Sequence, residues 1–291
     1  MTPAKSKSAY GLDTVSQTGA GETLALFELD GYSASDINAY ASYFNLPAPN
    51  LQNVLVGGAT GAAGPGAIEV TLDIELALAV APGLAKIMVY EGPNSDQGVL
   101  DTYSRIATDN LAKVVSTSWG LSEDEDSTAF LNGENTIFQQ MAAQGQGLFA
   151  ASGDSGAYDD PAHPSNLSVD DPASQPYVTA VGGTSLTLNA ANNSRSESAW
   201  SNAAKGMGGG GGVSKIWPLP AWQVPVSTSS NGESTSHRMV PDVSLDADPA
   251  TGYAIYMAQP GKSPWLLGIG GTRSEEHTSE LQSRLHLVCR L

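Results

Sequence analysis

Two carboxylates in the first third of the chain lie four residues apart, at Glu69 and Asp73. Residues at this spacing share one face of a helix, so the two side chains can touch. Like charges that close cannot both ionise easily, so one proton tends to be shared and one pKa rises. Such a pair can act as a general base in acid, whereas most pairs at this spacing are solvated surface groups. The apolar residues at 72–80 predict a helix buried nearly all round, which favours a functional pair.

A polar turn, Ser-Gly-Asp-Ser-Gly at residues 152–156, directly follows an apolar segment. In chymotrypsin-like proteases a Gly-Asp-Ser-Gly sequence holds the nucleophilic serine, and its base is an upstream histidine. None of the 4 histidines of this chain precedes Ser155, and the alternation of strands and helices does not suit paired β-barrels. We therefore predict that Ser155 is not a nucleophile of that type. Two interpretations of this segment remain: a polar turn with no function, or a turn that places Asp154 in a functional site.

Short apolar runs alternate with helical patterns over the first half of the chain. Strands are predicted at residues 23–28, 54–56, 86–90, 113–118 and 147–151. Helices are predicted at residues 33–44, 68–80, 97–109 and 127–143. This alternation predicts a mostly parallel sheet with helices on both faces, with ligands bound at the carboxyl ends of the strands. The glycine-rich residues 206–212 are predicted to form a flexible loop.

The charge balance restricts the classes of partner. The chain has 30 acidic and 13 basic residues and a net charge of −17, which argues against nucleic acid and anionic membranes. No apolar stretch is long enough to span a membrane. No signal peptide is visible, so either the protein is cytosolic or the chain begins downstream of its export signal. A single cysteine, Cys289, excludes a disulfide framework. The scarcity of cations indicates either acid tolerance or a surface that is halotolerant or merely soluble.

Six sequence blocks, in order, resemble the sedolisin family of serine-carboxyl peptidases. They are AYG with ETLALFELDGY (9–32), IEVTLDIELALAVAPGLAKIMVY (68–90), STSWG (116–120), AASGDSGA (150–157), GGGVSKIWPLPAWQ (210–223) and RMVPDVSLDADPATGY (238–253). The resemblance covers most of residues 9–272. It implies a subtilisin-like α/β fold and hydrolysis of peptide bonds, as an endopeptidase or as a tripeptidyl-peptidase.

The resemblance also implies catalytic roles. Glu69 matches the general base, Asp73 the carboxylic acid that hydrogen-bonds it, and Asp154 the oxyanion-hole residue. A glutamate with a reference pKa of about 4.3 can act as a base only near that pH. Asp154 can stabilise an oxyanion only as a protonated donor. Both conditions hold at roughly pH 3–5, where a histidine base would be protonated.

Further residues are expected to support the substrate and the carboxylates. Ser118, Trp119 and Gly120 match the segment that lines the substrate backbone, and Glu28 matches a supporting carboxylate. The resemblance implies a peptide or protein substrate, a prosegment, a secreted protein and calcium as cofactor. We expect a monomer, no nucleic-acid partner and no membrane partner. The calcium ligands of the family lie beyond residue 272, so no metal ligand is assigned here.

The family's nucleophile is the serine of a Gly-Thr-Ser block, but here Thr272 is followed by Arg273, and Ser274 comes one place late. Residues 273–283, RSEEHTSELQS, are what one reading frame of a common short-read sequencing adapter encodes. We therefore interpret residues 1–272 as a truncated peptidase domain and 273–291 as a non-native tail. The literal chain is expected to be inactive and poorly folded. The alternatives are a peptide-binding pseudopeptidase and an acidic secreted adhesin or structural domain.

Overall fold

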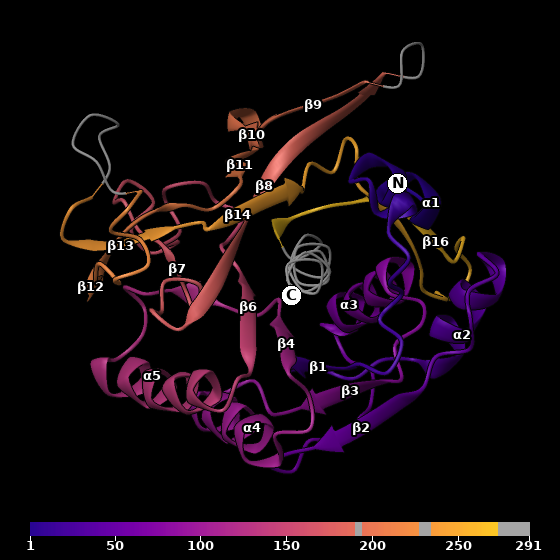
Figure 1. Ribbon diagram of the computed structural model, residues 1–291, viewed down its shortest axis with the longest axis horizontal. Coiled ribbons are helices and arrows are strands. Elements are labelled where there is room, and N and C mark those ends of the chain that lie inside the picture. Colours follow the sequence, from indigo (N-terminus) through magenta and orange to yellow (C-terminus); the bar gives the residue numbers. More distant parts are fainter. Residues whose placement is uncertain (190–193, 227–233, 273–291) are drawn as a thin grey trace.

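The computed structural model describes residues 1–189, 194–226 and 234–272 and is organised around one large sheet (Figure 1). Seven strands of this sheet are parallel, in the order β14-β8-β6-β4-β1-β3-β2, and β9 pairs antiparallel with β8. The strands are β1 (Thr23–Glu28), β2 (Leu51–Leu55), β3 (Lys86–Glu91), β4 (Val114–Thr117), β6 (Gly147–Ala151), β8 (Val178–Asn189), β9 (Ser194–Ala199) and β14 (Val243–Asp246).

Helices cover both faces of the sheet, because alternate residues of each strand point to opposite sides. On one face, Leu24 and Leu26 of β1 belong to the same core as Ile74 of α3. On the other face, the core contains Phe27 of β1 and Tyr103 of α4. The helices are α2 (Ala34–Tyr43) and α3 (Ala67–Val80) on the first face, and α4 (Asp96–Asp109) and α5 (Thr128–Ala143) on the second. The predicted architecture, a mostly parallel sheet with helices on both faces, is confirmed.

The helix α3 is buried nearly all round, as its sequence predicts. Twelve of its 14 residues are buried. One side packs on the sheet, and another packs against a hairpin, where Leu72 and Leu76 share a core with Tyr253 and Ile255. The hairpin consists of β15 (Tyr253–Tyr256) and β16 (Trp265–Ile269), and α1 (Pro3–Ala9) also contacts α3. The carboxylates of α3 are therefore held inside the molecule.

Short paired segments that sequence patterns did not predict occur from residue 121 onward. They are β5 (Leu121–Ser122) with β7 (Asp170–Asp171), β10 (Ser201–Asn202) with β11 (Met207–Gly208), and β12 (Gly212–Pro218) with β13 (His237–Val240). Two 3-10 turns, Leu12–Thr14 and Ala203–Lys205, complete the described elements.

The glycine-rich residues 206–212 are packed and hydrogen-bonded, so the prediction of a flexible loop is wrong. Gly208 N donates to the carbonyl of Asp154 at 2.8 Å, and Gly210 N donates to the carbonyl of Gly153 at 2.7 Å. A Cβ at Gly210 would overlap the carbonyl oxygen of Ser152. Glycine is required here because two backbone segments touch, and the run supports the turn that carries Asp154.

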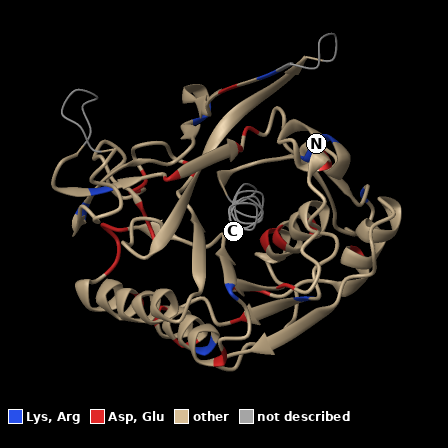
Figure 2. Ribbon diagram, viewed as in Figure 1, with Lys and Arg blue, Asp and Glu red and all other residues tan. Residues whose placement is uncertain are grey.

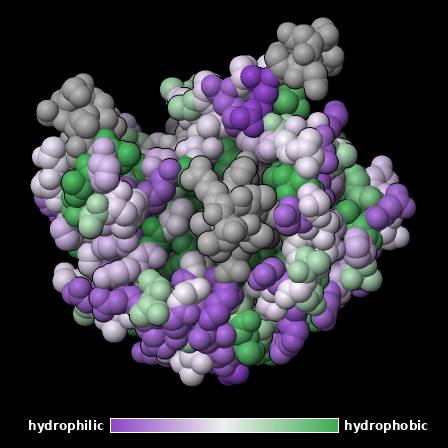
Figure 3. Space-filling model, in the orientation of Figure 1, coloured by the Kyte–Doolittle hydropathy of each residue, from purple (hydrophilic) through white to green (hydrophobic). Residues whose placement is uncertain are grey.

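The surface follows the composition of the chain. Acidic residues outnumber basic ones 30 to 13, and Lys and Arg appear only at scattered positions in Figure 2. Hydrophilic residues spread along the lower edge of the face in Figure 3, where α4 lies in Figure 1. Within the described ranges, no helix has both the length and the apolar character needed to cross a lipid bilayer.

Candidate active site

The site lies at the carboxyl ends of three neighbouring parallel strands. Glu28 is the last residue of β1, residue 118 follows β4, and Asp154 follows β6 by three positions. Register places Phe27 beside Thr117 and Thr117 beside Ala150, so the three strand ends lie side by side. This is the edge of a parallel sheet at which ligands bind, as the sequence predicts.

Asp73 is fully buried in the middle of α3 and is hydrogen-bonded to Ser118. Oγ of Ser118 lies 2.8 Å from Oδ1 and 2.7 Å from Oδ2 of Asp73. A buried carboxylate is costly without a donor, so this contact stabilises its position. It also links α3 to the end of β4 across 45 positions of sequence.

Glu28 is buried at the end of β1 and accepts a hydrogen bond from the indole of Trp119. Trp119 Nε1 lies 2.9 Å from Oε2 of Glu28. Burial, followed by the negative charge of Asp73, raises the pKa of Glu28 well above its usual range. The bond from Trp119 opposes this rise, and the charge of Glu69 adds to it. The three predicted carboxylates Glu28, Glu69 and Asp73 therefore form one electrostatic group.

Glu69 lies in the first turn of α3 and is half-buried. It is one helical turn from Asp73, on the same face of the helix. The start of the helix is held by a carboxylate that sequence reasoning missed, Asp30, which accepts from Gly64 N at 2.8 Å and from Gly66 N at 2.6 Å. A Leu-Asp-Gly sequence just after a strand could have signalled this role, because aspartate commonly bonds nearby backbone N–H groups.

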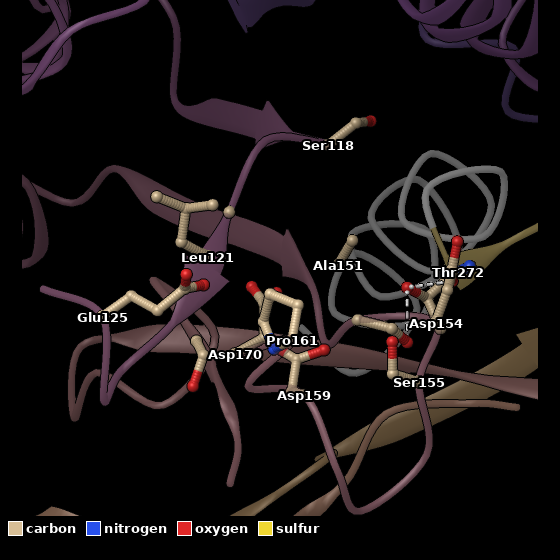
Figure 4. Close-up of a pocket in the computed structure, with 13 residues that line it drawn as sticks. Ser118, Leu121, Glu125, Ala151, Asp154, Ser155, Asp159, Pro161, Asp170 and Thr272 are labelled. Carbon is tan, nitrogen blue, oxygen red and sulfur yellow. Dashed lines mark hydrogen bonds between the residues drawn. The ribbon is translucent and has the colours of Figure 1, made fainter. Parts of the chain in front are cut away.

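Asp154 is joined to the end of the described chain. Its Oδ1 accepts from the backbone N of Thr272 at 2.7 Å and from Oγ1 of the same residue at 3.1 Å (Figure 4). Gly271 has a φ of 121°, and a Cβ there would lie 2.6 Å from Oδ2 of Asp154. The Gly-Gly-Thr segment can approach Asp154 only because residue 271 is glycine.

A pocket of about 180 Å³ opens beside Asp154, and Figure 4 shows its lining. Of the predicted residues, Ser118, Gly120 and Asp154 line it, together with Thr272, whereas the other four are not among its lining residues. A Cβ on Gly120 would lie 2.5 Å from the carbonyl oxygen of Asp171, so only glycine fits. The structure thus gathers the predicted residues into a buried carboxylate group and an adjoining pocket.

Ser155 is exposed, and the two histidines among the described residues bond to other side chains. His163 Nδ1 lies 2.7 Å from Oδ2 of Asp160, and His237 Nδ1 lies 2.8 Å from Oγ of Ser236. Among the described residues, no group of three or more His, Cys, Asp or Glu side chains is arranged to hold a metal ion. The expected calcium ligands and the position of the expected nucleophile lie outside the described residues.

Comparison with known proteins assigns the chain to a family. Residues 55–258 match the subtilase family model. The chain is 41% identical over 268 residues to kumamolisin of Bacillus sp. (strain MN-32), which covers 87% of this chain and 47% of that protein. It is 31% identical over 273 residues to sedolisin of Pseudomonas sp. (strain 101), covering 88% and 45%. The chain therefore spans about half the length of the relatives it matches.

A solved structure of Pseudomonas sedolisin, a serine-carboxyl proteinase complexed with two molecules of pseudo-iodotyrostatin, has the same fold. It superposes with a TM-score of 0.87 at 30% identity and covers 99% of this chain and 81% of that one. This agreement confirms the subtilisin-like architecture that the sequence predicts. On these grounds, the chain belongs to the sedolisin family of serine-carboxyl peptidases.

Proposed function

We propose that this chain is part of a serine-type peptidase that hydrolyses peptide bonds at acid pH. The observation that carries the proposal is the buried carboxylate group of Glu28, Glu69 and Asp73 beside the pocket of Asp154. A parallel sheet gains nothing in stability from three carboxylates at one edge, because each must be protonated or paired when buried. Such a group suits proton transfer in acid.

Glu69 is the general base in this proposal, and Asp73 positions it. The nucleophilic serine hydroxyl attacks the carbonyl carbon of the substrate, and its proton passes to the carboxylate of Glu69. Glu69 then delivers that proton to the departing amine, which leaves an acyl-enzyme. Water attacks the ester and gives its proton to Glu69, which passes that proton to the serine oxygen as the bond to the acyl group breaks and the product acid leaves. Ser118 stabilises Asp73 and so fixes the face of α3 from which Glu69 acts.

Asp154 is the proposed oxyanion donor. It lies on the pocket wall together with Ser118 and Gly120, which we assign to the segment that lines the substrate backbone. A protonated carboxyl can donate a hydrogen bond to the negative oxygen of the tetrahedral intermediate. Trp119 and Glu28 support the carboxylate group behind this segment. This assignment requires acid pH, because an ionised Asp154 would repel the oxyanion.

The serine itself is expected directly after Thr272, where this chain has Arg273. Thr272 N and Oγ1 are both bonded to Asp154, which would bring a serine at the next position close to the proposed oxyanion donor. We propose that the chain with the given sequence is inactive, because Ser274 lies one residue after the position expected for the nucleophile. The second candidate function, peptide binding without catalysis, is favoured if Arg273 is truly encoded.

We also propose the environment and partners of the whole protein. Its substrates are peptides or proteins, and it acts outside the cell as a monomer after removal of a prosegment. Calcium would bind beyond residue 272, and it is a structural ion in this proposal rather than a reactant.

Peptide hydrolysis at pH 4 tests the proposed function. The purified chain is compared with a protein in which Thr272 is followed by the residues that the source gene encodes after that codon. Each of the two is also made with Glu69→Gln. We expect the given chain to be inactive and the continued chain to be active, with activity lost on Glu69→Gln. Activity in the given chain that Glu69→Gln abolishes would contradict the proposed loss of the nucleophile. Equal activity of both Glu69 forms would contradict the role of the base.

A further inference from the structure

A second pocket, of about 290 Å³, borders the same segment of chain as the first. Gly120 and Leu121 line both pockets, and Trp119 lines only the second among these three. The second pocket is bounded by β1, by α4 and α5, and by one residue within β7 and the next one after it, Asp171 and Pro172. We call it the acidic pocket, and its polar lining includes four carboxylates: Asp96, Asp126, Glu134 and Asp171.

Among these four carboxylates, Glu134 combines deep burial with an oxygen that has no hydrogen-bond donor. It lies on α5 with a side chain that is only 2% exposed, yet it lines the acidic pocket. No N–H or O–H group of the described residues donates to its buried Oε2. A hydrogen bond joins the carboxyl groups of Glu134 and Asp171, and the buried Oε2 of Glu134 still lacks a donor. A buried carboxyl oxygen without a donor is costly, so a donor on a bound ligand would stabilise it. Asp171, also buried, has a donor in Gln175 Nε2 at 2.9 Å.

The carboxyl groups of the acidic pocket resist ionisation when the pocket is empty, so a bound cation would favour their charged forms. Burial, then the neighbouring charge of Asp171, raises the pKa of Glu134 well above its usual range. Burial raises the pKa of Asp171 to about 6, and burial together with the charges of Asp171 and Asp96 raises that of Asp126 to about 7. The other charges that act on these groups, from Glu123, Glu125 and Asp170, are also negative. No Lys, Arg or His is among the lining residues.

The lining of the acidic pocket suits an organic cation rather than a metal ion. No set of carboxylates in the described part of the chain is arranged to hold a metal. The walls are partly aromatic: Phe27 stacks on Tyr103 with ring centroids 4.0 Å apart, and Trp119 and Phe130 are the other aromatic residues of the lining. An alkyl stem can pack on such walls while its charged head reaches the carboxylates.

We propose that the acidic pocket binds the cationic side chain of a lysine or arginine in the substrate and so selects basic peptides. This inference rests on the proposed peptidase function, because the peptide must run along residues 118–121. Successive side chains of an extended peptide point to opposite sides. A residue adjacent to the one in the Asp154 pocket would therefore direct its side chain into the acidic pocket. Glu134 and Asp171 are the specificity-determining residues of this proposal, and neither belongs to the predicted catalytic set.

Binding of matched peptides to the purified full chain tests the inference. Fluorescently labelled hexapeptides carry either lysine or norleucine, which has a similar stem without the ammonium, at each position in turn. At pH 7 we expect one position at which lysine tightens binding roughly tenfold, as charge-assisted hydrogen bonds of this kind do. Glu134→Gln and Asp171→Asn should each reduce that ratio toward one. Asp101→Asn, which removes one charge from the exposed side of α4, should leave it unchanged.

A small probe separates this inference from the proposed function. Binding of n-butylammonium is compared with that of n-butanol by saturation-transfer NMR, which needs no peptide groove. If norleucine peptides bind and lysine adds nothing at any position, the inference is wrong and the proposed function stands. If no peptide binds, but n-butylammonium binds and Glu134→Gln abolishes its binding, then the acidic pocket binds cations and the proposed peptide binding is contradicted. If neither probe binds, the inference is overturned. Asp126→Asn, at the half-buried rim, replaces any buried variant that fails to fold.

Discussion

Ser118 and Asp73 are joined by a buried contact in which Oγ lies 2.8 Å and 2.7 Å from the two carboxylate oxygens. Both residues are buried, at 2% and 0% exposure, so water cannot replace the hydroxyl. The contact holds a helix residue against the end of the neighbouring strand β4. It therefore holds Glu69, one helical turn earlier, in a fixed position relative to the end of β4.

Ser118→Ala tests this contact. The change removes a buried donor from Asp73, and we expect a loss of about 1–3 kcal/mol in the free energy of unfolding. Urea denaturation at pH 5 measures the loss. Ser104→Ala, at an exposed position of α4, is the control and should change stability by less than about 0.5 kcal/mol. Equal stability of the Ser118 variant and the parent would show that the contact does not stabilise Asp73.

Glu75 should make the protein less stable as the pH rises. Burial, opposed by a hydrogen bond from Tyr256 N and aided by the charge of Asp36, raises its pKa from 4.5 to about 9. The folded state then holds a proton that the unfolded state loses, so stability is full below pH 4.5 and falls through the window up to about 9. The slope for one such group reaches about 1.4 kcal/mol per pH unit.

The variant Glu75→Gln isolates that effect, because glutamine keeps an acceptor for Tyr256 N and cannot ionise. Thermal unfolding should show a gain of at least about 1 kcal/mol over the parent at pH 8 and no gain at pH 4. Asp101→Asn, which is exposed, should show no such difference between the two pH values. A gain for Glu75→Gln that is the same at both pH values would contradict titration as its cause.

Gly210→Ala should damage the fold, because a Cβ there would overlap the carbonyl of Ser152. We expect destabilisation of about 3 kcal/mol or more, since backbone on both sides must move. Gly147→Ala is the matched control, because its Cβ would make only an ordinary contact of 3.6 Å with Phe149. Chemical denaturation of the two variants measures the difference. Similar stabilities would mean that the glycine-rich segment yields as a flexible loop would.

Sequencing of the source locus across codon 273 tests the interpretation of the tail. We predict that serine follows Thr272 in the genome and that the adapter-like residues 273–283 are absent. Reads that confirm Arg273 would exclude a serine at the predicted position and favour peptide binding without hydrolysis.

The sheet and helices of the first half were predictable because their apolar periodicity is local. The strand at residues 147–151 agrees at both ends with β6, and the helix predicted at 68–80 differs from α3 by one residue. The strand predicted at 54–56 is instead β2, Leu51–Leu55, in which only Val54 is buried, so polar residues concealed its start. Alternation of strands and helices was sufficient to bring Glu28, residue 118 and Asp154 to one edge.

The rest depends on contacts between distant residues, which local patterns do not encode. Gly210 is glycine because it touches Ser152, 58 positions earlier, and not because the chain bends there. The hairpin of β15 and β16 forms by covering α3, and the acidic pocket arises where Glu134 of α5 meets Asp171 of β7. None of these pairings has a periodic signal in the sequence.

The dependence of kcat/KM on pH tests the central claim, that carboxylates rather than a histidine activate the serine. The assay uses the protein in which the gene-encoded residues follow Thr272, with a peptide substrate between pH 3 and 8. Its Glu69→Gln variant is assayed in parallel. We predict highest activity at roughly pH 3–5, where Glu69 can accept a proton and Asp154 can donate one. We also predict a loss of at least about a hundredfold in the variant. Highest activity near pH 8, with Glu69→Gln as active as the parent, would contradict the account.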